Sequence, residues 1–182
     1  MAVGRICIYP CGGIKKVEAT VARIAGYIVN EDLMPGKTML MCVPAFLRGV
    51  EEDILMMERN PTIVIDCHME SCASHLMHLV GIKPAARIYI PEIMKETGLG
   101  PGKNRQELDE EGNQLALAVA EKVATIGRWM LEDRDYNFVE CKVRDKRRTL
   151  GEAFDDIEKA LEYIRVSPGV YRPRFMPPII GE

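Results

Sequence analysis

The sequence lacks an excess of charge of either sign. Its 182 residues carry a formal net charge of -3, with 24 Lys and Arg against 27 Asp and Glu. Nucleic-acid-binding domains usually present a basic face, so this mild acidity argues against that class. The basic run at residues 142–148 is interrupted by Asp145 and contains no aromatic residues, which favours a solvated loop. We therefore expect no nucleic-acid partner.

Long apolar segments are also missing. No run approaches the roughly 18 apolar residues that a membrane-spanning helix requires. The opening MAVGRICIYPCGG has no long apolar core after a basic segment, so it indicates a strand rather than a signal peptide. We expect a cytoplasmic protein without membrane contact, in which cysteines are thiols, thiolates or metal ligands rather than disulfides. The six cysteines are Cys7, Cys11, Cys42, Cys67, Cys72 and Cys141.

The common sequence motifs of nucleotide, zinc and hydrolase sites are absent. Neither the G-x-G-x-x-G fingerprint nor the Walker A pattern occurs, so a nucleotide site has little support. There is no CxxC…CxxC pair, and no Ser-His-Asp arrangement or pair of carboxylates stands out. Motifs therefore leave open whether the protein is an enzyme.

The first hundred residues alternate between strand-like and helix-like segments. Short apolar runs predict four strands, at residues 5–10, 37–45, 62–66 and 86–93. Helical periodicity predicts helices between them, at about 17–30, 48–60 and 71–81. Repeated β-α-β units favour a parallel sheet with helices packed on it. We predict an α/β fold with an open, mostly parallel sheet of four or five strands and helices on both faces, in a Rossmann-like three-layer arrangement.

The second half of the chain has a different pattern. A long helix is predicted from about Gln106 to Leu131, and YNFVECKV (136–143) is a candidate fifth strand. The capping box formed by Thr149 and Glu152 predicts a further helix that reaches Ile164. The last sixteen residues contain four prolines and are expected to form an extended tail over the body or a partner. We expect an α/β metal-binding domain at 1–100 and a C-terminal extension at 101–182, packed on the same core.

Soft-metal ligands follow three of the predicted strands. Cys11, Cys42 and the pair Cys67-His68 each stand where a strand ends. The carboxyl ends of parallel strands meet at one edge, where open α/β sheets bind ligands. Thiolate and imidazole are the ligands that zinc prefers. The sequence therefore predicts that these side chains converge on one site, with Cys72, one helical turn after His68, as a further candidate.

The segment DCHMESCASHLMH adds candidates and alternatives. On a helix, residues 68, 72 and 75 would share one stripe, which makes His75 an additional candidate ligand; Cys72 and His75 can equally be ordinary helix residues. Asp66, before these residues, could orient His68, act as a general base or cap the following helix. The cap is the commonest of the three roles.

Structural roles compete with functional ones at the first strand. A free cysteine often behaves as a small buried hydrophobe, which suits Cys7 inside the strand but suits Cys11, before a Gly-Gly turn, less well. Gly12 and Gly13 most simply form a tight turn. Glycines that open a helix can also expose N–H groups to an anion and lower the pKa of a nearby thiol.

These segments resemble the DGC-domain proteins, a group described as candidate zinc-binding proteins of unknown function. The resemblance covers about residues 5–95 and rests on YPCGG, MLMCVPA and VIDCHMESCA. Cys11 in Pro-Cys-Gly matches the family's first turn, Cys42 matches the Cys after the second strand, and Cys72-Ala73 matches the Cys-Ala before a helix.

The central family motif, I-D-G-C, is altered in this chain. Aligned without a gap, Cys67 takes the family's Gly position and His68 takes its second Cys position. The resemblance thus implies Cys11, Cys42, His68 and Cys72 as the zinc ligands. Cys67 replaces His68 in that set if the strand end shifts by one residue.

Three functions follow as hypotheses. The first, which we favour, is a zinc-binding α/β domain whose metal is structural or holds a ligand site. The second is a thiol or sulfur-handling protein, in which Cys11 or Cys67 carries a persulfide or exchanges disulfides. The third is an accessory or assembly protein that binds a partner through the long helix and the Pro-rich tail, with an iron–sulfur cluster on its thiolates. Homo-oligomerisation also stays open.

Overall fold

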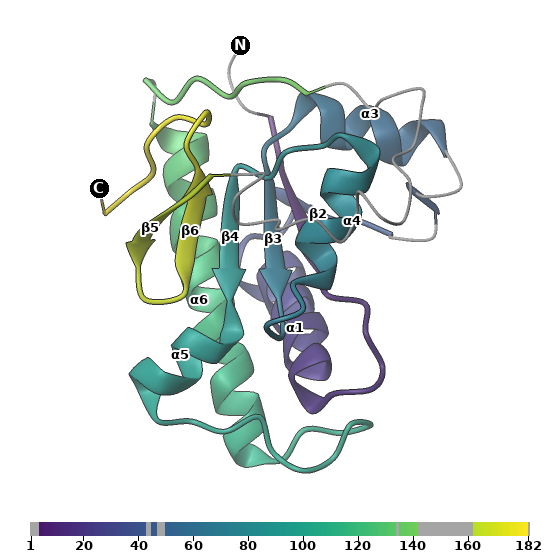
Figure 1. Ribbon diagram of the computed structural model, residues 1–182, viewed down its shortest axis with the longest axis vertical. Helices are drawn as coiled ribbons and strands as arrows, with labels where there is room; N and C mark the ends of the chain where they lie inside the picture. The colour runs from purple at the N-terminus through teal and green to yellow at the C-terminus, as the bar shows by residue number, and fades with distance from the viewer. Residues whose placement is uncertain (1–3, 43–44, 47–49, 134, 142–161, 182) are drawn as a thin grey trace.

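The computed structural model describes residues 4–42, 45–46, 50–133, 135–141 and 162–181. Within these residues the chain forms one six-stranded mixed sheet in the order β2-β1-β3-β4-β6-β5 (Figure 1). The strands are β1 (Ile6–Pro10), β2 (Thr38–Leu40), β3 (Thr62–Asp66), β4 (Ala86–Tyr89), β5 (Tyr163–Ser167) and β6 (Val170–Pro173). The helices are α1 (Val17–Tyr27), the π-helical η1 (Ile28–Leu33), α3 (Glu51–Arg59), α4 (Cys72–Val80), α5 (Ile90–Thr97) and α6 (Glu110–Glu132).

The sheet combines a parallel half with an antiparallel edge. The pairs β1–β2, β1–β3 and β3–β4 are parallel, whereas β6 is antiparallel to both β4 and β5. The predicted α/β class is therefore confirmed. The expectation of four or five strands was wrong, because a C-terminal hairpin extends the parallel sheet.

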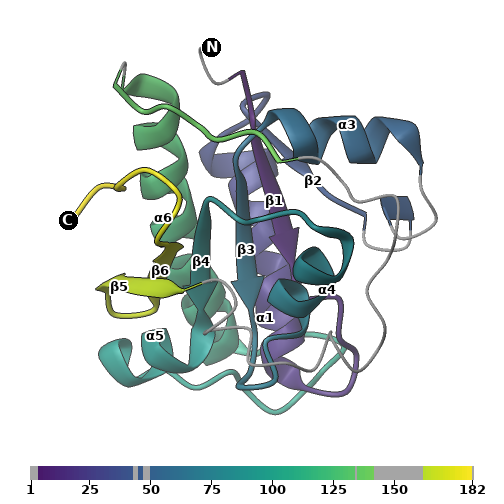
Figure 2. The same cartoon turned by 45° about the horizontal axis from the view of Figure 1, so that its top comes forward.

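The strand order reverses between β1 and β3. From β1 the chain passes to β2 on one side, then returns to form β3 on the other side of β1. Figure 2 shows β1 and β3 side by side, ending at the same edge of the sheet. Such a reversal is a topological switch point, where open α/β sheets leave a crevice at the carboxyl ends of their strands.

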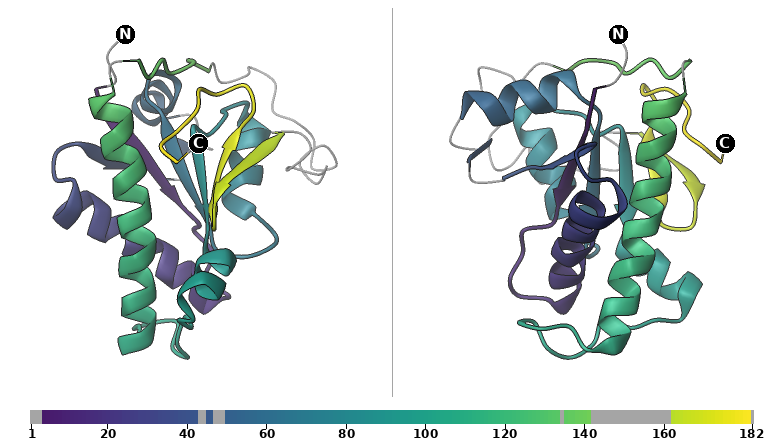
Figure 3. Two further views of the ribbon diagram at one scale, coloured as in Figure 1. Left: turned by 90° about the vertical axis from the view of Figure 1, so that its left-hand side faces the viewer. Right: turned by 180° about the vertical axis from the view of Figure 1, so that it is seen from behind.

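Helices cover both faces of the sheet. The two views of Figure 3 show α1 and α6 on one face and α3 and α4 on the other. All five residues of β3 are buried, as the uninterrupted apolar run TIVID predicts for a strand covered on both sides. The long predicted helix is confirmed as α6, and its large apolar residues on one side are all buried: Leu115, Val119, Val123, Ile126 and Met130.

Helix α1 packs through its small residues. Ala19, Val21, Ala22 and Ala25 are buried, whereas Ile24 and Ile28 are only half-buried. A Cβ added at Gly26 would lie 3.1 Å from Leu40 Cδ2. Small side chains on this face, Gly26 among them, therefore let α1 approach the sheet closely.

The C-terminal strands differ from those predicted. Residues 136–141 form no strand, and the edge of the sheet comes from β5 and β6 instead. The expectation of an extended Pro-rich tail over the body holds for residues 174–181, which form no strand and bury Met176 and Ile179. It was wrong for residues 167–173, which belong to a hairpin whose interior the prolines avoid. Pro168 and Gly169 (φ +71°) form the two-residue turn between Ser167 and Val170, as in a type II turn, and Pro173 ends β6.

The helix predicted from Thr149 lies largely outside the described residues. Ile164, expected at its end, belongs to β5, so the predicted helix extended too far. In the part of the chain that the structure describes, no helix has both the length and the apolar character needed to cross a bilayer.

Candidate functional site

The switch point brings two thiols together. Cys11 follows β1 and Cys67 follows β3, and the Cys11 backbone N–H donates to the Ile65 carbonyl at 2.9 Å. The Cys67 thiol donates to the Cys11 sulfur across 3.1 Å. Their exposed fractions are only 2% and 7%. The parallel register of β1 and β3 thus turns two cysteines 56 residues apart in sequence into a buried sulfur pair.

The two thiols of this pair differ in acidity. The hydrogen bond from Cys67, together with one from the Gly13 backbone, outweighs burial and lowers the pKa of Cys11 from 9.0 to about 7. The same hydrogen bond, followed by burial, raises the pKa of Cys67 far above that of a free thiol. Near neutral pH, the proton therefore stays on Cys67 and negative charge develops on Cys11.

Cys72 belongs to the same electrostatic environment. It is the first residue of α4 and is exposed. Partial burial and then the charge of Cys11 raise the pKa of the Cys72 thiol, and Cys72 in turn contributes to the raised pKa of Cys67. We call Cys11, Cys67 and Cys72 the switch-point thiols.

Cys42 lies further along the same edge. It is exposed and follows β2 by two residues. Burial is the main cause of the raised pKa of Tyr9, and the charges of Cys11 and Cys42 add to it. The Tyr9 side chain is therefore electrostatically close to both cysteines.

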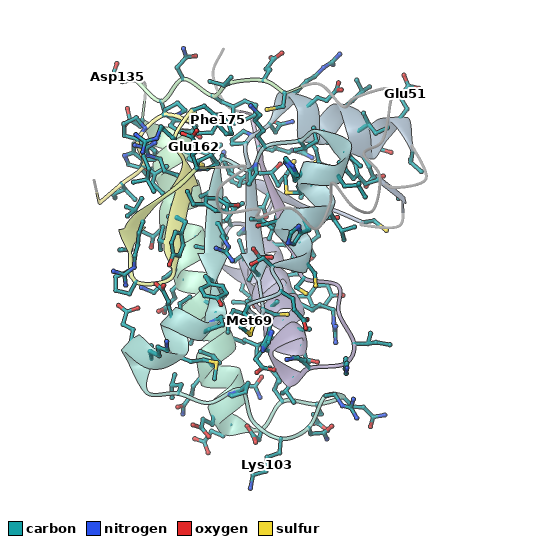
Figure 4. The ribbon with its side chains drawn as sticks, viewed as in Figure 1. Glu51, Met69, Lys103, Asp135, Glu162 and Phe175 are labelled. Atoms are coloured by element: carbon teal, nitrogen blue, oxygen red, sulfur yellow. The ribbon has the colours of Figure 1, made fainter. Side chains whose placement is uncertain are left out.

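His68 faces different neighbours. Its Nε2 is 2.8 Å from the Lys16 ammonium nitrogen. It lines a pocket of about 710 Å³ together with Met69 and Tyr89. Figure 4 marks this region by Met69, in the β3–α4 loop, while Lys103 lies farther out in the loop before α6. His75, three residues after Cys72 on α4, is half-buried.

The described residues contain no preassembled metal cage. Across the described ranges, no three His, Cys, Asp or Glu side chains are grouped closely enough to hold an ion. The donor chemistry of the sulfur pair nevertheless fits zinc, because two sulfurs bound to one tetrahedral zinc at about 2.3 Å lie roughly 3.8 Å apart. The observed 3.1 Å separation would need only a small opening.

Asp66 is occupied by structural hydrogen bonds. The completely buried carboxylate accepts the backbone N–H groups of Ala73 and Ser74 at 3.1 and 3.2 Å. It also accepts the Ser74 hydroxyl at 2.6 Å and Arg87 Nε at 2.8 Å. These contacts are those of a cap on the first turn of α4, and they fix the end of β3 just before Cys67.

Sequence reasoning missed Arg87. This side chain is 1% exposed, pairs with Asp66, also donates to the Ser71 hydroxyl, and lies over the rings of Tyr89, Tyr163 and Tyr171. The available signal was a single charge inside the apolar run ARIYI, because an arginine buried in a strand requires a partner.

The glycines after Cys11 form an exposed turn. Gly12 and Gly13 are both exposed, and the Gly13 carbonyl accepts Arg23 Nη1 at 2.5 Å. The Gly13 backbone also helps to lower the pKa of Cys11. The turn therefore connects the sulfur pair to helix α1.

Comparison with known proteins identifies the family. The DGC domain model matches residues 7–121, more than half of the chain, from β1 to the middle of α6. No curated protein and no solved structure matches the chain. The matched segment contains the switch-point thiols, Cys42 and His68, and the protein belongs to the DGC-domain family.

Proposed function

We propose that this DGC domain binds zinc through the switch-point thiols Cys11, Cys67 and Cys72. The observation that carries the proposal is the buried Cys11–Cys67 pair, with sulfurs 3.1 Å apart and the pKa of Cys11 lowered to about 7. The thiolate is the form of cysteine that ligates metals. This pair therefore offers one ligand already in its binding form and a second within reach.

The third and fourth positions follow from the surrounding residues. Cys72 shares the electrostatic environment of the pair and is the proposed third ligand. Cys42, whose charge acts on Tyr9 together with that of Cys11, is the protein residue to test as a fourth. Zinc bound there would supply a Lewis acid if water or a ligand took the fourth position. The chain itself would supply the thiolates and the buried surroundings that keep water from Cys11 and Cys67.

Metal analysis of variants tests this proposal. The full chain, purified anaerobically without added metal, should contain about one zinc per chain. Cys11→Ser and Cys67→Ala should each lose most of it, and Cys72→Ser should weaken zinc retention against a chelator. Cys141→Ser is the matched control, because this half-buried thiol lies outside the switch point. Unchanged zinc content in both Cys11→Ser and Cys67→Ala would contradict the proposal.

A second function, reversible thiol–disulfide exchange, has its own support. An attacking thiol is most effective when its pKa lies near the ambient pH, which matches Cys11 at about 7. A disulfide of about 2.05 Å would need the sulfurs to approach by roughly 1 Å. Formation of the bond would release two protons and pass two electrons to an oxidant such as a low-molecular-weight disulfide.

Redox titration of the same chain after metal removal tests the exchange function. Metal-free protein is equilibrated with glutathione redox buffers, and the mass of the Cys11–Cys67 peptide pair is measured. Loss of two hydrogens, reversed by reduction, supports the exchange function, and persistent free thiols exclude it. Iron and acid-labile sulfide in the anaerobic protein would instead indicate the cluster alternative.

A further inference from the structure

A pocket of about 390 Å³ lies beside the switch-point thiols. Its walls come from α1, α4 and the carboxyl ends of β1 and β2. Apolar side chains, among them Leu40, Met41 and Leu76, form most of the lining. The volume is at the lower end of that of small-molecule sites, so it suits a compact ligand. The metal proposed above uses only one residue of this lining, Cys72.

The first sign of a ligand is the Tyr9 hydroxyl. Tyr9 lines the pocket and is fully buried, yet its hydroxyl has no hydrogen-bond partner among the described residues. Leaving a buried hydroxyl unpaired costs roughly 1–3 kcal/mol, and native structures pair most such groups with protein or water. A ligand whose polar atom came within hydrogen-bonding distance of this covered oxygen would satisfy it.

The second sign is the charge of Arg23. It is the charged side chain among the described lining residues, and no carboxylate accompanies it there. Its Nη1 donates to the Gly13 carbonyl at 2.5 Å and its Nη2 to the Thr20 hydroxyl at 2.9 Å. Both acceptors are neutral, and within the described residues no ion pair joins Arg23 to a carboxylate. Arg23 therefore places a positive charge on the pocket wall that an anionic group of a ligand can face.

We propose that this pocket binds a compact organic monoanion with an apolar body, its carboxylate facing Arg23 and a second polar group paired with the Tyr9 hydroxyl. The apolar lining would cover the body of the ligand. This ligand site is separate from the proposed zinc site, and binding there does not require a metal ion. Because Cys72 lines the same pocket, the bound molecule would lie against one of the switch-point thiols.

A trio of matched probes tests the proposal on metal-free full-length protein. The probe 6-hydroxy-2-naphthoate carries both polar groups, 2-naphthol lacks the carboxylate, and 2-naphthoate lacks the hydroxyl. Equilibrium dialysis should show saturable binding of the complete probe. Affinity should fall at least about 10-fold without the carboxylate, as expected for a charged hydrogen bond, and about 2- to 10-fold without the hydroxyl.

Two conservative variants assign these differences to residues. Arg23→Gln should abolish the advantage of the carboxylate and leave 2-naphthol binding within about two-fold. Tyr9→Phe should abolish the advantage of the hydroxyl. Arg128→Gln is the control, because Arg128 donates to the Leu33 carbonyl and lines a different pocket. Absence of saturable binding, equal affinity for the three probes, or survival of either advantage in its variant overturns the proposal.

Discussion

Two buried polar centres occupy adjacent residues at the end of β3, and they differ in how fully their atoms are paired. Asp66 accepts hydrogen bonds from the first turn of α4 and from Arg87. Cys67, the next residue, donates its thiol hydrogen to the sulfur of Cys11. Beside that sulfur pair, the buried Tyr9 hydroxyl has no partner in the described structure. We call the Asp66–Arg87 centre complete, because its carboxylate is surrounded by hydrogen-bond donors. We call the thiol centre incomplete, because its sulfurs and the nearby Tyr9 hydroxyl can still bind a ligand.

The difference separates a structural role from a functional one. A carboxylate surrounded by donors anchors a helix to a strand and has little capacity left for another molecule. A partly ionised thiol with one sulfur neighbour can still bind a metal or attack a disulfide. The Asp66–Arg87 centre should therefore have the larger effect on stability, whereas the switch-point thiols should govern binding.

The largest expected effect comes from breaking the complete centre. Arg87→Met should lower the free energy of unfolding by about 3–5 kcal/mol, because it leaves a buried carboxylate without its cation. Urea denaturation followed by circular dichroism measures this loss. In the double variant Asp66→Asn/Arg87→Met, much of it should return, since neither charge is then buried alone. A loss below about 1 kcal/mol in the single variant would show that the pair does not anchor α4.

The second effect concerns the acidity of the incomplete centre. Cys67→Ala removes the hydrogen bond that is the largest cause of the lowered pKa of Cys11. The midpoint of Cys11 ionisation, followed by the ultraviolet absorbance of the thiolate in metal-free protein, should rise from about 7 toward 9.0 or above. Cys141→Ser should leave it unchanged. An unshifted midpoint would mean that Cys67 does not stabilise the thiolate.

The same shift gives stability a defined pH dependence. The folded state lowers the pKa of Cys11 from 9.0 to about 7, so its contribution is fully present above 9 and is lost as pH falls toward 7. Cys67, whose pKa is raised in the folded state, acts in the opposite direction once pH exceeds 9. The free energy of unfolding should therefore rise between pH 7 and 9 and then stop rising, and Cys67→Ala should remove this rise.

A smaller effect on stability is expected at Glu92, a carboxylate near the surface whose hydrogen bonds are also made within the protein. Glu92 accepts the Gly169 backbone N–H at 2.8 Å, Arg165 Nε at 3.1 Å and the Tyr171 hydroxyl. Glu92→Gln should cost about 1 kcal/mol and speed amide exchange in β5 and β6. Glu96→Gln, which removes an ion pair elsewhere on α5, should leave exchange in the hairpin unchanged. Unchanged exchange in Glu92→Gln would show that this carboxylate does not hold the hairpin.

The lowered pKa of Glu92 sets how the stability of the β5–β6 hairpin changes with pH. Partial burial acts to raise the pKa of Glu92, but the hydrogen bonds from Tyr171, Gly169 and Arg165 outweigh it and lower the pKa. Its contribution to stability is thus present above the ordinary carboxyl pKa and is lost as pH falls through the lowered value. Protection of the hairpin amides should decline over that acidic range in the wild type and not in Glu92→Gln.

Much of the parallel half could be predicted from the sequence because its signals are local. The run TIVID is apolar at every buried position of β3, and a strand that ends at Asp66 must place Cys67 at the edge. The convergence of Cys11 with that edge then follows from parallel pairing alone. What the sequence could not decide was whether Cys67 or His68 would face the crevice, because that depends on the backbone path of the β3–α4 loop.

The antiparallel edge was missed for a different physical reason. Its prolines suggested an extended tail, but Pro168 occupies a turn and Pro173 ends the strand, where neither needs to donate to the ladder. Arg87 presents a related problem. A charge within an apolar strand signals a buried partner, but nothing local identifies Asp66, 21 residues earlier, as that partner.

The smallest effect is expected at His68, and it decides between the two ligand sets. The resemblance to the family places His68 at a ligand position, whereas the structure places its Nε2 2.8 Å from the Lys16 ammonium. A metal could use that nitrogen only after the cation moved away, since both compete for one lone pair. The buried Nδ1 has no partner among the described residues, but it carries the ring proton while Nε2 accepts from Lys16, so it too could bind a metal only once that contact was lost. His68→Ala should therefore keep its zinc content under conditions in which Cys67→Ala loses it. The reverse pattern would restore His68 to the ligand set and leave Cys67 as a hydrogen-bond donor that tunes Cys11.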